Sequence, residues 1–190
     1  METIHERIYE RAKPYLNTRQ NEVHIAICYA FARRLLKCYP NADENIVVPA
    51  ILLHDVGWKE VPEEKQLGAF GPEMKDEETR RLHETEGARI AKTILNSVNY
   101  SEEKTQEILA IIDGHDSRQE ALSLNDSLVK DADKLWRYSP TGVNIDHVRF
   151  GIDRESYLDW IGTTIDEWLF TACARVMARE GLDEARTAKS

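Results

Sequence analysis

Apolar residues recur at helical spacing along most of the chain, and no segment alternates strictly between apolar and polar positions as a half-buried strand would. The pattern predicts helices over about 2–15, 19–39, 48–56, 77–96, 102–112, 128–138 and 154–179. The third could instead be capped by Asp43 or Asn45, in which case we expect a kink at Pro49. We therefore expect an all-α protein, a single-domain bundle of about six to seven helices. This domain should span residues 1–180, followed by a polar C-terminal tail, 181–190, that frays.

The longest interruption of this pattern runs from Gly57 to about Asp76 and contains several glycines and prolines. Long loops in compact domains are usually functional, so we interpret the segment as a lid or a pocket wall. The stretch from Trp136 to Phe150 is the second segment expected to set substrate specificity. Neither stretch carries a motif that names a substrate.

The most informative motif is an apolar run, Ile51–Leu53, that ends in His54 and Asp55 and is followed by Gly57. A buried helix ending here would deliver an imidazole and a carboxylate to one point, and Gly57 suits the position that terminates a helix. Further candidate ligands occur at intervals along the chain: His24, His83, His115, Asp131 and Asp133.

This ordered set resembles the signature of the HD-domain superfamily of metal-dependent phosphohydrolases, which is a His, then a His-Asp doublet, then a distant Asp. The matching residues are His24, His54, Asp55 and Asp131, and the resemblance covers about residues 17–140. It implies that these four side chains hold a divalent metal. Asp131 and Asp133 cannot share a helix face, and the resemblance selects Asp131, leaving Asp133 at the surface or behind the ligands.

The roles of His83 and His115 decide whether the chain holds one metal or two. In dinuclear members of the superfamily, histidines at about these positions hold a second metal. Three roles stay open for them here: second-metal ligands, contacts to a substrate phosphate beside one metal, or ordinary histidines at helix ends. His5 and His147 match no position of the pattern and are treated as ordinary side chains.

Imidazoles and carboxylates together suit a divalent transition metal, namely Mn, Fe, Co, Ni or Zn, with one or two ions per chain. We expect no thiol near the motif, which argues against a structural zinc site. The resemblance implies hydrolysis of a phosphomonoester or phosphoanhydride in a small, nucleotide-like molecule by metal-bound hydroxide. The expected catalytic residues are His54, Asp55, His83 and His115.

Positive charge for the substrate phosphate must come from nearby side chains. Lys134 and Arg19 are the preferred candidates because both belong to helices that carry expected ligands, and Lys59, four residues after the doublet, is the third. Arg80 and Arg81, which precede His83, are weaker candidates.

Two other functions fit the same motif. A minority of HD-fold proteins are diiron oxygenases that cleave C–C or C–P bonds with a His, His-Asp, His, His, Asp set, and the order of ligands here is compatible with them. The context of Asp131 resembles the hydrolases more closely. The third possibility is a non-catalytic module that binds a metal or a nucleotide.

Composition narrows the partners. The net charge of −9 argues against nucleic acid as the main partner but allows a small phosphorylated molecule. Three cysteines without a CxxC motif indicate reduced thiols, and neither a signal peptide nor a membrane-length apolar run is evident. We expect a soluble, cytoplasmic protein without a membrane partner, whose last helix packs on the core or on a second subunit in a homodimer.

Overall fold

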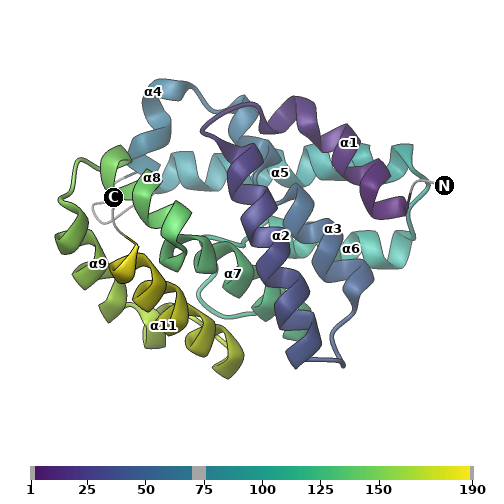
Figure 1. Ribbon diagram of the computed structural model, residues 1–190. Helices are drawn as coiled ribbons and strands as arrows, with labels where there is room; N and C mark the ends of the chain where they lie inside the picture. The colour runs from purple at the N-terminus through teal and green to yellow at the C-terminus, as the bar shows by residue number, and fades with distance from the viewer. Residues whose placement is uncertain (1–2, 70–75, 189–190) are drawn as a thin grey trace.

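The computed structural model describes residues 3–69 and 76–188, and within these ranges it contains eleven α-helices, three short 3₁₀ helices and no strand (Figure 1). The all-α prediction is therefore confirmed for the described residues. The α-helix count exceeds the predicted six to seven for three reasons: the expected loop contains the helix Glu63–Gln66, the helix Pro140–Arg149 was not predicted, and the expected last helix is divided into three.

The chain begins with four elements that surround the His-Asp doublet: α1 (Ile4–Leu16), α2 (Asn21–Cys38), α3 (Glu44–Leu53) and the 3₁₀ helix η1 (Val56–Glu60). The middle of the chain contributes α4 (Glu63–Gln66), η2 (Leu67–Ala69), α5 (Glu77–Ser97), α6 (Glu102–Ile112), α7 (Leu124–Leu135) and η3 (Trp136–Tyr138). The C-terminal part contains α8 (Pro140–Arg149), α9 (Arg154–Thr163), α10 (Ile165–Trp168) and α11 (Ala172–Thr187).

Helix α3 is the centre of the bundle. Every residue from Ile46 to Leu53 is buried, and the helix packs against α1, α2, α6 and α7 (Figure 1). A helix that is apolar on all sides can only be accommodated inside a core. Asp43 caps its N-terminus by accepting a hydrogen bond from the backbone N–H of Asn45, and the helix continues through Pro49 without ending. The core thus holds His54 and Asp55 at a fixed place.

Gly57 has a different role from the one expected. It lies within η1 and makes a very close approach to α5: a Cβ there would be 1.9 Å from the carbonyl oxygen of His83 and 2.4 Å from the backbone nitrogen of Gly87. Its backbone is not in the left-handed region that terminates helices. Gly57 therefore joins the segment after the doublet to the helix that carries His83.

The segment after the doublet is more ordered than the expected loop. Residues 57–69 form η1, α4 and η2, and Trp58, Val61 and Ala69 make a small buried cluster against Phe150. Residues 70–75, which belong to the same predicted lid, lie outside the described part of the chain. The described portion is a packed wall beside the doublet.

The expected helix over 154–179 is interrupted twice, after Thr163 and again between Trp168 and Ala172. The second break has a tertiary cause, because the backbone N–H groups of Phe170 and Thr171 donate to the carboxylate of Asp131 instead of continuing a helix. The prediction of a frayed tail from residue 181 is wrong for its first part. Helix α11 continues to Thr187 and buries Gly181, Leu182 and Ala185.

Two cysteines that were expected to be reduced are joined in the structure. Cys38 at the end of α2 and Cys173 at the start of α11 form a disulfide between segments 135 residues apart. Cys28 is the remaining cysteine and is buried. Sequence spacing could not indicate this pairing, because only the packing of α11 on α2 brings the two residues together. Among the described residues, no helix is both long enough and apolar enough to cross a membrane.

Candidate metal centre

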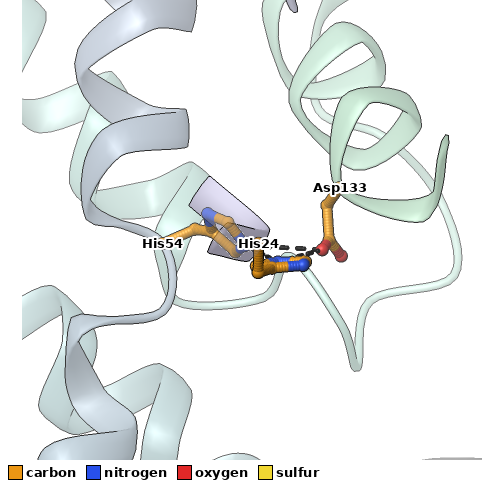
Figure 2. A group of neighbouring side chains, drawn as sticks. All are labelled: His24, His54 and Asp133. Carbon is orange, nitrogen blue, oxygen red and sulfur yellow. Dashed lines mark hydrogen bonds and ion pairs between the residues drawn. The ribbon is translucent and has the colours of Figure 1, made fainter. Parts of the chain in front are cut away.

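Two histidines from different helices face each other at the end of α3. The Nε2 atoms of His24 on α2 and His54 at the C-terminus of α3 are 3.2 Å apart (Figure 2). The carboxylate of Asp133 on α7 approaches both, with Oδ1 3.1 Å from Nε2 of His24 and 3.4 Å from Nε2 of His54. Two imidazole nitrogens at this separation need a proton or a cation between them.

A second pair of histidines repeats this arrangement a short distance away. The Nε2 atoms of His83 on α5 and His115 after α6 are 3.3 Å apart, and Oδ2 of Asp116 lies 3.5 Å from the Nε2 of His83. Both rings are buried. The structure thus brings all four predicted histidines of the motif into two neighbouring clusters.

The backbone determines which nitrogen of each key ring is available. The Nδ1 atoms of His54 and His115 each lie 2.9 Å from a carbonyl oxygen, that of Ile51 and that of Ile112 respectively. A carbonyl can only accept, so Nδ1 carries a proton and Nε2 is the nitrogen that points into the cluster. This is the arrangement that prepares histidine as a metal ligand.

Asp55 lies between the two clusters. Its carboxylate oxygens are 3.5 Å from Nε2 of His24, 3.7 Å from that of His54 and 3.8 Å from that of His115. Its Oδ1 also accepts a hydrogen bond of 2.9 Å from the indole N–H of Trp58. The clusters therefore form a chain of three overlapping groups, namely His24, His54 and Asp133; then His54, Asp55 and His115; then His83, His115 and Asp116.

The carboxylate that faces the histidines is that of Asp133, not that of Asp131 as the sequence predicted. Both oxygens of Asp131 accept backbone hydrogen bonds, from the N–H of Phe170 at 2.7 Å and of Thr171 at 2.9 Å, on the side of α7 facing α11. Successive helical residues are about 100° apart, so Asp133, two positions later, points to the opposite side, toward His24. No property of the Asp-Ala-Asp sequence reveals which carboxylate faces the histidines.

The pKa shifts of Asp133, Asp55 and Asp131 distinguish the roles of these three carboxylates. Burial alone would raise the pKa of Asp133, but hydrogen bonds and charge from His24 and His54 lower it well below the usual value. The pKa of Asp55 is lowered in the same way, against the effect of burial, chiefly by His54. Burial raises the pKa of Asp131, which has no histidine partner. Asp55 and Asp133 are thus the acidic groups that stay ionised and available to a cation.

The two histidines of the second cluster have opposite environments. Burial, with a smaller effect of the charge on His115, lowers the pKa of His83 to about 4. Burial would also lower the pKa of His115, but the nearby carboxylates of Asp55 and Asp116 raise it to about 10. His83 is stacked on Trp58 with ring centroids 4.0 Å apart. It is therefore a neutral imidazole, the form that binds metals.

Glu84 supports the second cluster from behind. It is fully buried and accepts hydrogen bonds from the backbone N–H groups of Asp116 and Ser117, at 2.9 and 2.8 Å, and from the Ser117 hydroxyl. Arg81, one of the weaker phosphate candidates, forms an ion pair with it. The turn that presents His115 and Asp116 is thus held by Glu84 on α5, one residue after His83.

The three cations predicted to bind phosphate lie in different places. The guanidinium of Arg19 lies over the Trp58 ring, 3.8 Å from its centroid, and borders a cavity beside His24 and Asp55. Lys134 borders a second cavity that also includes Asp133. Lys59 instead donates to Asn17 at the surface and borders neither of these cavities. Of these three cations, Arg19 and Lys134 lie near the cluster and Lys59 does not.

Cavity size alone does not identify the site. A cavity of about 510 Å³ is bordered by α1, α2 and α3 and contains none of the clustered ligands. The cavity at the cluster is small, about 40 Å³, and is bordered by His24, Asp55 and Asp133. A third cavity of about 310 Å³ shares Asp116, Asp133 and Arg137 with the small one. The latter two together form the candidate site.

A thiol lies closer to the cluster than the sequence suggested. Cys28, one helical turn after His24, has its sulfur 3.5 Å from Nε2 of that histidine. Burial raises the pKa of Cys28 well above its usual value, so the group is a neutral thiol in the metal-free protein. The expectation that no thiol lies near the motif is therefore wrong.

The protein is thus an all-α bundle with a candidate divalent-metal centre, formed by these buried histidines and carboxylates. The chain belongs to the HD domain family, whose model matches residues 23–137. HD domains bind divalent metals and are usually metal-dependent hydrolases. No curated protein and no solved structure gives a significant match.

Several residues of the site escaped sequence reasoning. Asp116 follows His115 directly and could have been proposed from that adjacency. Trp58, which donates to Asp55 and stacks on His83, lies in the predicted pocket wall but was not named individually. Arg137 and the buried Asp146, which pair at 3.3 Å, likewise lie in the 136–150 segment expected to set specificity without having been named. Each depends on tertiary contacts between separate helices.

Proposed function

We propose that this protein is a metal-dependent phosphohydrolase that acts on a small phosphorylated molecule, with a divalent metal held by His24, His54, Asp55 and Asp133. The observation that carries the proposal is the convergence of two ionised carboxylates on the Nε2 atoms of a facing histidine pair. A metal held there would polarise a phosphoryl oxygen and lower the pKa of bound water.

A second metal would be held by His83, His115 and Asp116, with Asp55 next to both groups. The facing Nε2 atoms of His83 and His115, and the neutral state of His83, support this role over that of ordinary surface histidines. Both rings are also buried, which surface histidines would not be. The proposal is therefore one or two transition metals per chain, drawn from Mn, Fe, Co, Ni and Zn.

The residues around the metal ligands have roles of their own. Arg19 and Arg137 border the small cavity and would attract the negative charge of a phosphoryl group. Asp146 holds Arg137 and Arg149, and Arg149 donates to the carbonyl of Arg19 at 2.8 Å. This contact supports the left-handed backbone of Arg19, whose φ is 54°.

The proposal is tested by metal analysis and phosphate release. Protein purified without added metal is loaded with each of the five ions and assayed against a panel of phosphorylated metabolites. We expect phosphate release that is abolished, together with metal binding, by His54→Ala. His147→Ala is the matched control, because the Nδ1 of this histidine lies 3.2 Å from the Ile152 carbonyl oxygen, outside the cluster. Retained turnover in the His54 variant would contradict the proposal.

The diiron oxygenase is the second candidate, and the position of Asp55 between two histidine pairs favours it over a non-catalytic module. It predicts two irons per chain, oxygen consumption and no phosphate release. Tight ligand binding without turnover by any metal form would instead indicate a binding module.

A further inference from the structure

The two cavities at the cluster meet at three shared residues, Asp116, Asp133 and Arg137. The small one, about 40 Å³, has room for a compact polar group beside the candidate metal ligands. The larger one, about 310 Å³, has the size of a small-molecule site. A substrate with its phosphoryl group in the first would extend its remaining part into the second.

Part of the wall of the larger cavity comes from outside the matched family region. Trp168 and Phe170 belong to α10 and the break that follows it, well beyond residue 137. The ammonium of Lys134 lies 5.6 Å from the centroid of the Phe170 ring. Two further cations, Arg80 and Arg118, border the same cavity. This recess therefore combines aromatic surface with charges of both signs, since Asp116, Asp133 and Glu167 also border it.

The aromatic wall is held in place by the helix that carries the acidic ligand. Asp131 accepts the backbone N–H groups of Phe170 and Thr171, and Asp133 faces the histidines two residues later on α7. The Thr171 side chain caps α11 by accepting from Ala174, and Cys173 ties the same segment to α2. The wall thus keeps a defined position relative to the metal ligands, which reduces the entropic cost of binding.

We infer that this recess selects substrates whose non-phosphate part is a flat aromatic or heteroaromatic ring, stacked on Phe170 beside Trp168 and Lys134. The inference rests on the proposed function for the orientation of the phosphoryl group. Aromatic side chains favour offset-stacked or edge-to-face contacts with rings over contacts with saturated groups of similar size. Phe170 is then a specificity-determining residue.

The test uses full-length, manganese-loaded protein and two non-hydrolysable probes, phenylphosphonate and cyclohexylphosphonate, with dissociation constants measured by calorimetry. We expect wild-type protein to bind the flat ring about three- to tenfold more tightly than the saturated ring. Phe170→Leu should remove this preference, and Phe170→Tyr should keep it. Tyr29→Ala, in the unrelated cavity near α1, is the control and should keep it as well.

Equal affinity for the two probes in the wild type would overturn the inference, as would an unchanged preference in Phe170→Leu. Far-ultraviolet circular dichroism and melting temperature confirm that each variant is folded. The proposed function fails separately: no phosphate release from any ester with any metal would reject it even if phenylphosphonate were preferred. Turnover of phosphate esters without a ring preference would reject the recess alone.

Discussion

The carboxylate of Asp133 lies 3.1 Å from the Nε2 of His24, whereas Asp131, in the same helix, lies on the opposite side and holds the backbone of Phe170. The two aspartates of one Asp-Ala-Asp sequence thus serve two tasks. One completes the candidate metal centre, and the other anchors the wall of the adjoining cavity.

Isosteric amide substitutions should separate these tasks. Asp133→Asn should lower the affinity for divalent metal by at least about tenfold, because it removes an ionised ligand. Asp131→Asn should retain the metal and destabilise the fold by about 1–3 kcal/mol, because one of two buried backbone N–H groups loses its acceptor. Elemental analysis after dialysis and urea unfolding measure the two effects. Loss of metal in Asp131→Asn with metal retained in Asp133→Asn would identify Asp131 as the ligand instead.

Gly57→Ala should be strongly destabilising, by about 3 kcal/mol or more. The added Cβ would meet two backbone atoms of α5, at 1.9 and 2.4 Å, and backbone cannot move aside as a flexible side chain can. Gly68→Ala is the control, since the nearest atom to its Cβ is the Asp76 Cβ at an ordinary 3.6 Å. Equal melting temperatures for the two variants would contradict the close approach.

Glu84 should stabilise the metal-free protein in a pH-dependent manner. Burial would raise its pKa, but the charge of His115 and hydrogen bonds from Ser117 and Asp116 outweigh burial and lower the pKa to about 2. A lowered carboxyl pKa gives stability that is fully present above the unfolded value of 4.5 and is lost as pH falls toward about 2.

Glu84→Gln should therefore lower the free energy of unfolding by about 2 kcal/mol at pH 7, and by progressively less as pH falls below about 4.5. Urea titrations of wild type and variant at several pH values give this difference directly. Glu86→Gln, on an exposed ion pair of the same helix, is the control and should show a small effect at every pH. A constant difference for the Glu84 variant would contradict the lowered pKa.

The disulfide predicts a simple thiol count. Denatured, unreduced protein should show one reactive thiol, that of Cys28, and three after reduction. Cys38→Ser should lower the free energy of unfolding by about 4 kcal/mol, because the bond closes a long loop of the unfolded chain. Cys28→Ser controls for the loss of a thiol in general. Three thiols without reduction would show that the bond is absent under the conditions used.

The sequence alone determined the class of fold and most of the candidate ligands. Helical periodicity predicted the all-α bundle, and the apolar run before His54 correctly placed the doublet at the end of a buried helix. The resemblance to the HD-domain signature implied that His24, His54 and Asp55 converge, whereas it left the roles of His83 and His115 open.

Only the tertiary structure decided which carboxylate completes the site, how the cysteines pair and what lines the adjoining cavity. Asp131 and Asp133 have the same chemistry, and their roles depend on which side of α7 faces α2 and which faces α11. The break at Phe170 likewise depends on an acceptor 39 residues earlier in the chain. Periodicity reports which residues are buried, whereas the partner that a buried polar group meets is set by how the helices pack.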